Sequence, residues 1–287
     1  MGNALRGKNL AIKEKNKLKE QIENRRNKGL YIPKLAMVIV GDDGGSIFYV
    51  NHQSKVCEEV GVIPHVVKLP EDVSQEKLIL EIERLNENKE VAGIIIMMPL
   101  PKHIDVKFVL SKLKPEKDLD GLTEVNAAKL YLGEKCHVPC TPKGIVHLLK
   151  ENGIELSGKR VVIIGRSNIV GKPLFHLMLQ ENATPTICHS KTKDIKEVCR
   201  EADVIVSAIG KPKFLTSDFI KEGAVVLDVG TSSVEGKITG DVDFEDVIDK
   251  ASYVTPVPGG VGSVTNIVLL LNMMEGLYAK TPDSNTD

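Results

Sequence analysis

Residues 161–175, with the sequence VVIIGRSNIVGKPLF, place an apolar run before two glycines and a proline, as expected of a phosphate-binding turn between a strand and a helix. Gly165 allows the backbone to leave the strand sharply, and Gly171 allows a bulky anion to approach the start of the helix. Pro173 suits the first turn of a helix, where no N–H donor is needed. The spacing is Gly-x5-Gly and not the usual G-x-G-x-x-G, so an ordinary strand–helix turn is the alternative interpretation.

Basic and hydroxyl side chains follow the next expected strand, residues 184–188. That strand ends in the sequence HSKTK, and the first acidic residue after it is Asp194. An NAD-binding unit usually places an acid at this strand end to bind the ribose 2′-hydroxyl, whereas Arg166 and Ser190 could bind a 2′-phosphate. The two segments together favour NADP over NAD, with a solvated basic loop as the alternative.

Tyr49 lies on the helix expected after the first strand, one turn beyond Ser46, which we expect to cap that helix. In an α/β fold this position faces the carboxyl end of the strand, where ligands bind. A flat aromatic ligand could stack on Tyr49, and a core tyrosine is the alternative.

Two loops add further candidates. Asp120, in the sequence KDLDG, is a turn former by default, yet its carboxylate could also accept two hydrogen bonds from a ring of the 2-aminopyrimidine type. Residues 253–262, YVTPVPGGVG, contain two prolines and three glycines among few large side chains. We expect this rigid segment to form a wall against which a ligand can lie.

The composition favours small ligands. The chain has 287 residues, of which 42% are hydrophobic and 27% charged, and its formal net charge is −1. This balance gives no basic field for nucleic acid. The N-terminal segment is charged throughout, with no apolar core of signal-peptide length, and the longest apolar runs fall short of the roughly 20 residues of a membrane span. We therefore expect a cytoplasmic protein with neither a nucleic-acid nor a membrane partner.

The five cysteines are scattered, and their odd number does not indicate a disulfide framework. Cys136, His137 and Cys140 form a small cluster, but no second pair completes a tetrahedral set of metal ligands. We expect no metal site.

Apolar runs alternate with helical patterns along the whole chain, which predicts an α/β fold with parallel sheets and two domains. The expected strands are 35–40, 63–68, 93–97, 160–164, 184–188, 204–207 and 224–229. The expected helices are 46–60, 74–88, 142–150 (capped by Thr141), 173–181, 194–201 and 264–279. We expect one domain over residues 1–139 plus 265–287, a second over 140–264, and disorder only in the tail 281–287.

Taken together, these segments resemble the methylenetetrahydrofolate dehydrogenase/cyclohydrolase (FolD) family of one-carbon metabolism. The motifs that carry the resemblance are SxxY at 46–49, PLP at 99–101, KDLDG at 117–121, PCTP at 139–142, GRS at 165–167, CHSKT at 188–192 and PVPGGVG at 256–262. The resemblance implies an N-terminal α/β folate-binding domain completed by the last helix, a Rossmann-like NADP-binding domain with a parallel sheet, a cleft between them, and a homodimer.

The resemblance also implies roles for individual residues. Tyr49 would stack on the pterin of the tetrahydrofolate substrate, Asp120 would bind its ring nitrogens, and Pro258, Gly259 and Gly260 would flank the folate. The residues implied to contact NADP are Gly165, Arg166, Ser167, Ser190 and Thr231.

Two positions depart from the family where the hydrolytic step is carried out. Gln53 stands where the family has a lysine, and Met97 where it has a glutamine. Smaller departures are SVT after Gly262, where the family has PMT, and residues 230–232, which read GTS and not GIN. A Gln53 amide does not titrate, and Met97 is a weak acceptor that cannot orient a partner. His52 lies beside that helix face, whereas Lys55 is turned to its far side.

The predicted function is the NADP-dependent oxidation of 5,10-methylenetetrahydrofolate to 5,10-methenyltetrahydrofolate, with the cyclohydrolase step slow or absent. Hydride transfer chiefly needs alignment, whereas hydrolysis needs a group that activates water and moves protons. One alternative is a fully bifunctional enzyme that uses another base and releases 10-formyltetrahydrofolate. An alternative of another class is a non-catalytic sensor of folate or NADP.

Overall fold

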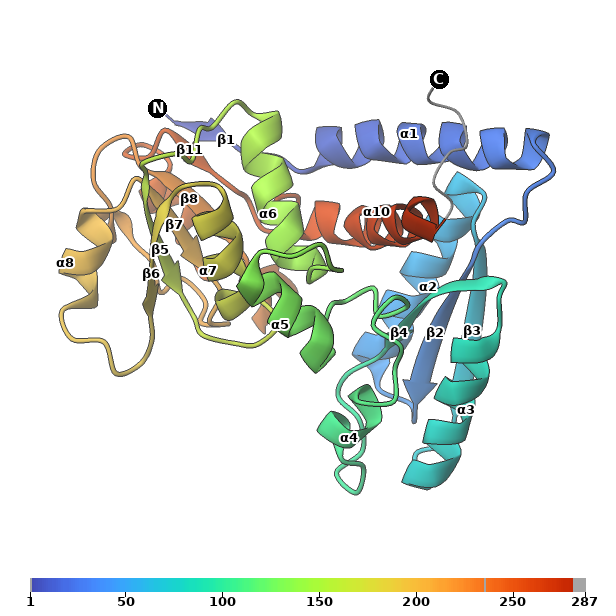
Figure 1. Ribbon diagram of the computed structural model, residues 1–287. Helices are drawn as coiled ribbons and strands as arrows, with labels where there is room; N and C mark the ends of the chain where they lie inside the picture. The colour runs from blue at the N-terminus through green and yellow to red at the C-terminus, as the bar shows by residue number, and fades with distance from the viewer. Residues whose placement is uncertain (1, 235, 281–287) are drawn as a thin grey trace. The chain divides into compact units, whose positions relative to one another are not determined.

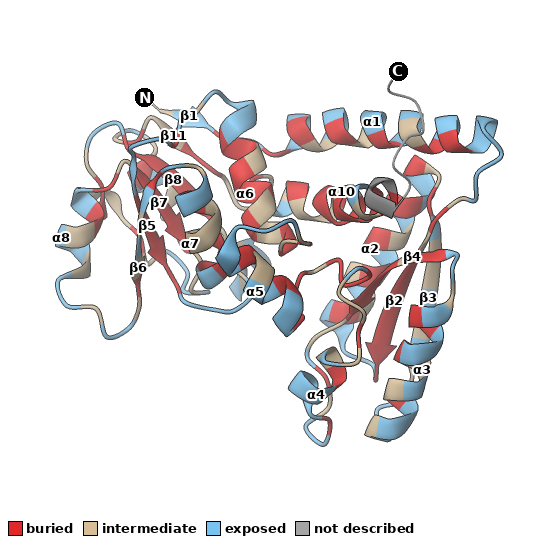
Figure 2. Ribbon diagram, viewed as in Figure 1, coloured by how far each residue is buried: buried red, intermediate tan, exposed pale blue. Residues whose placement is uncertain are grey.

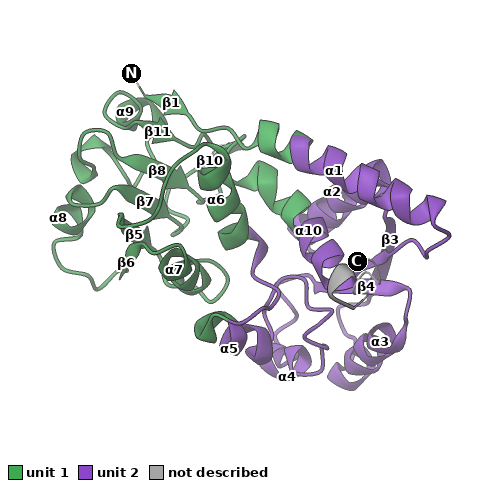
Figure 3. Ribbon diagram, turned by 45° about the horizontal axis from the view of Figure 1, so that its top comes forward, with its two compact units in different colours: residues 1–12, 130–133, 141–268 green, residues 13–129, 134–140, 269–287 purple. Residues whose placement is uncertain are grey.

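The computed structural model describes residues 2–234 and 236–280 of the chain (Figure 1). By compactness the chain divides into two units, coloured separately in Figure 3. Unit 1 comprises the residues up to 12, 130–133 and 141–268, and unit 2 comprises 13–129, 134–140 and the residues from 269 onwards. The expected tail, residues 281–287, lies outside the described residues.

Unit 1 contains a six-stranded sheet in the order β1-β11-β8-β7-β5-β6, and every pair of neighbouring strands is parallel. The strands are β1 (Asn3–Ala4), β5 (Arg160–Ile164), β6 (Thr184–Cys188), β7 (Val204–Ser207), β8 (Val225–Asp228) and β11 (Tyr253–Val254). The carboxyl ends of β5, β7 and β8 all lie at the same edge of the sheet, because parallel strands run in one direction. This edge is where open α/β sheets bind ligands.

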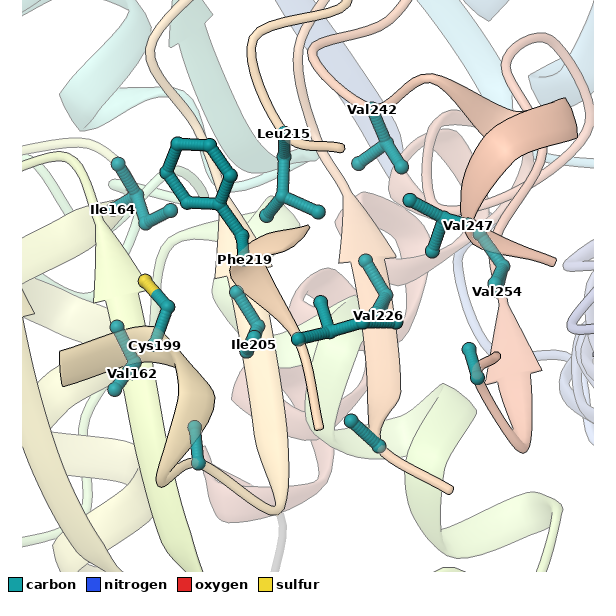
Figure 4. Packing of buried hydrophobic residues seen from close by; sticks show 14 of the residues in the cluster. Val162, Ile164, Cys199, Ile205, Leu215, Phe219, Val226, Val242, Val247 and Val254 are labelled. Carbon is teal, nitrogen blue, oxygen red and sulfur yellow. The ribbon is translucent and has the colours of Figure 1, made fainter. Parts of the chain in front are cut away.

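The central strands of unit 1 are buried on both faces. In β5, Val162 and Ile164 point into one core, together with Ile205 of β7 and Val226 of β8 (Figure 4). Val161, on the opposite face of the same strand, is also fully buried. This continuous apolar pattern is typical of a parallel strand covered by helices on both sides.

Helices and short elements complete unit 1. Its remaining elements are α7 (Gly171–Gln180), α8 (Ile195–Arg200), the 3₁₀ helix η1 (Ser217–Phe219), α9 (Phe244–Val247) and the antiparallel hairpin β9 (Ser232–Val234) with β10 (Lys237–Thr239). Side chains of α8, η1 and α9 pack into the core shown in Figure 4, while α7 packs against β5 and β6.

Unit 2 is built on a three-stranded parallel sheet in the order β3-β2-β4. Its strands are β2 (Lys34–Val40), β3 (Ile63–Leu69) and β4 (Val91–Ile96), and its helices include α2 (Gly44–Val60), α3 (Gln75–Glu87) and α4 (Val106–Leu110). The central strand β2 is buried from Leu35 onwards, whereas the edge strand β3 is only partly covered (Figure 2). Four helices contribute residues to both units: α1 (Lys8–Asn27), α5 (Glu124–Leu132), α6 (Cys140–Glu151) and α10 (Gly262–Lys280).

The expected α/β architecture with parallel sheets is confirmed, and β5, β6 and the β7 strand have the expected bounds. Two cap assignments are wrong. Asp43, and not Ser46, caps α2, because its carboxylate accepts the Ser46 N–H at 2.8 Å. Helix α6 begins at Cys140, ahead of the expected cap at Thr141.

The first residues of the chain group differently from the expected division. We expected residues 1–139 to form one domain with the last helix, but residues up to 12 belong to unit 1 by compactness. The reason is that β1 pairs with β11, with Asn3 opposite Tyr253 and Ala4 opposite Val254. The assignment of folate to one unit and NADP to the other stays a prediction.

Within the described parts of the chain, every helix falls short of either the length or the apolar character that a bilayer crossing requires.

Gly93 on β4 packs directly against the loop that contains Leu119. Substituting this glycine therefore tests how tightly the loop packs on the unit 2 sheet. A Cβ at Gly93 would lie 2.2 Å from Cδ1 of the fully buried Leu119. We expect Gly93→Ala to destabilise the protein by about 1–3 kcal/mol through overpacking. Gly44→Ala is the control, because nothing lies within 4 Å of its added Cβ, and it should be neutral or slightly stabilising. Thermal unfolding of both variants checks this, and equal midpoints would contradict the packing argument.

Candidate active site

The start of α2 positions Tyr49 in unit 2. Asp43 caps the helix, and the hydrogen bond that it accepts from the Ser46 N–H lowers the pKa of its carboxyl. Ser46 Oγ donates to the carbonyl oxygen of Met98 at 3.4 Å, which ties the first turn of α2 to the segment after β4. Tyr49 follows one turn later, so the cap and the Ser46 contact together fix where its ring lies.

The phenol of Tyr49 is held in its neutral form. Burial raises its pKa well above the usual value, and the negative fields of Asp120, Cys140 and Cys57 raise it further. Asp120, Cys140 and Cys57 therefore lie near Tyr49 within unit 2. A neutral, partly buried phenol offers an aromatic face and a hydroxyl donor.

Asp120 differs from the other charged residues of its loop in how its side chain is used. Lys117 Nζ donates to the carbonyl oxygens of Leu85 and Asn88 at 2.9 and 2.8 Å, so this ammonium binds the end of α3. Asp118 accepts hydrogen bonds from Leu122 N, Thr123 N and Asn126 Nδ2 at 3.1, 2.7 and 2.9 Å. The side chains of Lys117 and Asp118 therefore stabilise the conformation and the position of this loop.

The Asp120 carboxyl is surrounded by few groups that stabilise its charge. Burial and the neighbouring Asp118 raise its pKa to about 6, and a hydrogen bond from the Cys140 thiol acts in the opposite direction. The loop lies beside β4, because Ile94 N donates to the Lys117 carbonyl at 2.7 Å. The structure thus brings Asp120 close to Tyr49 at the carboxyl end of the unit 2 sheet.

Gln53 lies on α2, and Met97 lies at the end of β4. Gln53 is fully buried one turn after Tyr49 on α2, and its Nε2 lies 4.0 Å from Cys57 Sγ. Burial raises the pKa of the Cys57 thiol to about 12, so this group stays protonated. Met97 directly follows β4, and its backbone N–H donates to Val38 at 2.9 Å. The Gln53 amide therefore lies beside a neutral thiol.

Cys57 and Cys140 are neighbours of Tyr49 that the sequence analysis did not select. Cys57 lies eight residues after Tyr49 on α2, and this spacing returns a helical side chain to a similar face. Cys140 belongs to the PCTP motif and to the cluster with Cys136 and His137, and neither pattern predicted that it lies beside Tyr49. The helical spacing was the available signal for the first, and no local pattern marked the second.

In unit 1 the turn after β5 requires its glycines. Gly165 has φ of +127°, and a Cβ there would lie 2.6 Å from the Ala208 carbonyl oxygen. A Cβ at Gly171 would lie 2.1 Å from the Gly165 carbonyl oxygen. Ser167 Oγ accepts hydrogen bonds from Val170 N and Gly171 N at 3.1 and 3.4 Å. The expected tight turn before α7 is therefore present, and any side chain at Gly165 or Gly171 would collide with a backbone carbonyl.

The segments after β5 and β6 lie side by side, since Ile164 is opposite Cys188 in the parallel register. Gly165 N donates to the Cys188 carbonyl at 2.9 Å, which carries the pairing one residue further. Arg166, Ser167 and Ser190 are exposed at this edge. Thr192 Oγ1 accepts the His189 N–H at 2.9 Å and so closes the turn that presents Ser190.

Thr231 and residues 258–260 also belong to unit 1, whereas Tyr49, Gln53, Met97 and Asp120 belong to unit 2. Thr231 is exposed after Gly230, whose N–H donates to Asp228 at 3.0 Å. Gly259 has φ of +107°, and its carbonyl accepts the Gly7 N–H at 3.0 Å. This hydrogen bond ties the glycine-rich segment to the residue that precedes α1.

Among the described residues, no group of three or more histidine, cysteine or acidic side chains is arranged to hold a metal ion.

The fold and these sites define the class of protein. An all-parallel sheet with a glycine-dependent strand–helix turn is the architecture of a dinucleotide-binding domain. Unit 2 adds a second α/β body that carries a neutral tyrosine beside a half-buried carboxyl group.

Comparisons with known proteins identify the family. Residues 5–120 match the family model for the tetrahydrofolate dehydrogenase/cyclohydrolase catalytic domain, and residues 139–281 match the model for its NAD(P)-binding domain. The chain therefore belongs to the tetrahydrofolate dehydrogenase/cyclohydrolase family, which confirms the resemblance found in the sequence.

Individual relatives agree over nearly their whole lengths. The bifunctional protein FolD of Clostridium novyi is 53% identical over 277 residues, which cover 96% of this chain and 100% of that protein. The crystal structure of the bifunctional enzyme FolD from Campylobacter jejuni has a TM-score of 0.95 at 43% identity, covering 98% of this chain and 100% of that one. A Trypanosoma brucei FolD complexed with NADP and an inhibitor has a TM-score of 0.92 at 38% identity, covering 98% and 99%.

The pKa of Asp120 predicts how stability depends on pH. The folded protein keeps the Asp120 proton up to about pH 6, whereas the ordinary value is 3.8, so ionisation disfavours the folded state as the pH rises through this window. We expect Asp120→Asn to be more stable than the unmodified protein at pH 7.5, by on the order of 2 kcal/mol, with the difference vanishing near pH 4.

Asp118→Asn is the matched control. In this variant at least one donor to Asp118 meets the NH2 group of the asparagine and loses its acceptor, so the protein should be destabilised by about 1–3 kcal/mol at pH 4 and at pH 7.5. Thermal unfolding of the two variants at pH 4 and pH 7.5 makes the comparison. A destabilised Asp120→Asn at pH 7.5 would show that its carboxylate is a structural acceptor.

Proposed function

We propose that this protein oxidises 5,10-methylenetetrahydrofolate to 5,10-methenyltetrahydrofolate with NADP as the hydride acceptor. The observation that carries the proposal is the match to both domains of the family, together with 53% identity to a bifunctional FolD over 277 residues. The direct test is a spectrophotometric assay of the dehydrogenase and the cyclohydrolase half-reactions on the purified protein.

Unit 1 is the proposed NADP-binding domain. Each glycine of the turn, Gly165 and Gly171, packs against a backbone carbonyl that a Cβ would overlap, which brings the start of α7 close to the end of β5. The start of this helix is the proposed position of a cofactor phosphate. The proposed contacts to the cofactor are made by Gly165, Arg166, Ser167, Ser190 and Thr231. Arg166 and Ser190 are exposed after neighbouring strands, and Arg166 can neutralise a 2′-phosphate that an acid would repel.

Unit 2 carries the proposed pterin contacts. Tyr49 would supply an aromatic face for stacking, and Asp120 would accept hydrogen bonds from ring N–H groups. Burial disfavours the Asp120 carboxylate when it has no strong donors, so a ligand with two N–H groups would stabilise its ionised form. Pro258, Gly259 and Gly260 of unit 1 are proposed to flank the rest of the folate.

The dehydrogenase reaction requires mainly alignment from these residues. When bound, NADP supplies the acceptor for the hydride. The nitrogen lone pairs of the substrate stabilise the cation that remains after the hydride leaves the methylene carbon. The chain therefore needs no base for this half-reaction, and Tyr49 and Asp120 serve by fixing the position of the ring.

The hydrolytic half-reaction lacks a proton-transferring group at its usual place. Gln53 is fully buried and cannot titrate, and Met97 cannot orient a partner as an amide would. We infer that hydrolysis of the methenyl product is slow or absent. The product that leaves the enzyme would then be methenyltetrahydrofolate.

Full bifunctionality is the second candidate function, and the relatives favour it. The Clostridium novyi and Campylobacter jejuni proteins are both named as bifunctional. His52 would be the first residue to test as a replacement base, since it precedes Gln53 on α2 and is exposed. A non-catalytic sensor would bind folate and NADP without an absorbance change from cofactor reduction.

A homodimer and a cytoplasmic location complete the proposal. Both rest on the family resemblance and on the sequence composition, and analytical ultracentrifugation of the purified chain tests the first.

We expect methenyltetrahydrofolate to accumulate during turnover. General acid–base groups typically contribute about 10²- to 10⁴-fold, so residual hydrolysis should lie near the spontaneous rate. The double variant Gln53→Lys with Met97→Gln should restore part of the hydrolysis, limited by the burial of the new amine. Near-ultraviolet absorbance follows the methenyl compound directly. If the unmodified protein clears it far faster than buffer alone, the inferred loss of hydrolysis is wrong, and His52→Ala decides whether that histidine replaces the lysine.

We expect Arg166→Ala to raise the KM for NADP about tenfold or more and to leave any activity with NAD nearly unchanged. Hydrogen bonds to charged groups are worth roughly 1.5–3 kcal/mol each, and about 1.4 kcal/mol is a factor of ten. Arg160→Ala is the control, because Arg160 lies at the amino end of β5 and pairs with Glu201. Equal losses with both cofactors in Arg166→Ala would contradict a role in binding the 2′-phosphate.

A further inference from the structure

Two buried carboxylates of unit 1, Asp228 and Asp241, lie behind the loops that follow β7 and β8. Asp228 is 3% exposed and Asp241 is fully buried. Neither residue was selected from the sequence, and neither is among the proposed cofactor contacts. A buried carboxylate is costly unless several donors satisfy it, so the identity of those donors shows what each acid holds in place.

Asp241 holds the loop after β7. Its Oδ2 accepts hydrogen bonds from Ser207 Oγ at 3.0 Å and from Ile209 N at 2.7 Å, and its Oδ1 accepts one from Lys211 N at 2.7 Å. Ser207 ends the strand, so the three donors span the strand end and the first four residues after it. One side chain thereby fixes the path of this loop.

Asp228 holds the loop after β8 and also the residues around Asp241. Its Oδ1 accepts the N–H groups of Gly230 and Asp241 at 3.0 and 2.9 Å, and its Oδ2 accepts the N–H of Val242 at 2.9 Å. The two acids are thus connected in series through the Asp241 backbone. Burial raises the pKa of Asp228 to about 6, while the N–H groups of Val242 and Asp241 favour its charged form.

Two glycines make the close approach of these acids to the backbone feasible. A Cβ at Gly230 would lie 2.1 Å from Asp241 Oδ1, and a Cβ at Gly240 would lie 1.9 Å from Asp228 Oδ2. The arrangement therefore depends on small residues at both positions. It extends from the end of β8 to the loop after β7 through the two buried carboxyl groups and the backbone of Asp241.

The loop held by Asp241 contacts the turn at Gly165 that follows β5. Ile209, whose N–H donates to Asp241, directly follows Ala208, and the Ala208 carbonyl is the atom against which Gly165 packs. A displacement of residues 208–211 would therefore displace the wall of the turn at Gly165. On the other side, Asp228 fixes Gly230, which precedes Thr231.

We propose that Asp241 and Asp228 are positioning residues for cofactor binding, which hold the loops after β7 and β8 in the arrangement that receives NADP. This inference rests on the proposed NADP-binding function of unit 1. The acids act through backbone N–H groups and do not themselves touch the cofactor.

Asp241→Asn tests the proposal, because an amide offers one acceptor oxygen where three donors converge. We expect the Kd for NADPH, measured by NADPH fluorescence on the full chain, to rise about tenfold or more, because a buried donor left without its acceptor costs at least as much as a tenfold change in affinity. The KM for methylenetetrahydrofolate at saturating NADP should stay within about twofold. This split distinguishes positioning of the cofactor loops from general loss of structure.

Asp203→Asn is the matched control. Asp203 also accepts a backbone N–H, from Arg160 at 2.8 Å, and pairs with Lys221, but it precedes β7 at the opposite edge of the sheet. It should lower the thermal midpoint without changing the Kd for NADPH. Ser207→Ala removes one donor to Asp241 and should raise the Kd by about threefold, which keeps the test decisive if Asp241→Asn does not fold.

An unchanged Kd in Asp241→Asn, or in Ser207→Ala where Asp241→Asn cannot be purified, would overturn the inference. So would a parallel rise in the KM for the folate substrate. If the unmodified protein itself fails to bind NADPH, the proposed function of unit 1 is refuted, and this outcome is distinct from the failure of the positioning role.

Discussion

The contact between Gly165 and the Ala208 carbonyl is the constraint on which the carboxyl edge of unit 1 depends. With φ of +127° and an oxygen 2.6 Å from its virtual Cβ, Gly165 cannot be replaced without moving one of two adjacent strand ends. The turn before α7 is built on this contact, because Gly171 in turn packs on the Gly165 carbonyl. Parallel pairing of β5 with β7 brings the two backbones to the same level, and Gly165 lets the turn pass close to the residue that follows β7.

In unit 2 the relevant constraint is the protonation state of the side chains around Tyr49. Tyr49 and Cys57 are held neutral by burial, and Asp120 is the neighbouring group whose pKa lies near 6. An amine at position 53 would add a positive charge to this set, and Gln53 does not. Hydride transfer needs only alignment, whereas hydrolysis needs proton transfer, so replacing one titratable residue can separate two reactions that share a substrate site.

The sequence predicted those elements whose patterns are local and strong. Strand β5 is an apolar β-branched run that ends at a glycine, β6 is a short segment that ends at a polar cluster, and both have the expected bounds. Helix α1 was missed because its buried positions, such as Leu10, Leu18 and Ile22, are widely spaced among charged residues. Strand β1 was missed because only two residues pair, and their partner β11 lies about 250 positions away in the chain. The expected cap of α2, Ser46, was wrong because several polar residues near the start of this helix can serve as the cap, and Asp43 does so.

The roles of the acids show where prediction from sequence stops. Asp118, Asp120, Asp228 and Asp241 all stand in loops or at strand ends near glycines, and their local patterns look alike. What separates them is the number of donors that reach each carboxylate: three for Asp118, Asp228 and Asp241, and the Cys140 thiol for Asp120. Several of these donors lie up to 34 residues away, as between Ser207 and Asp241, so the distinction is a property of the fold. A carboxylate already saturated by the backbone holds loops, whereas one left in a partly buried site without such donors has its acceptor oxygens available for a ligand.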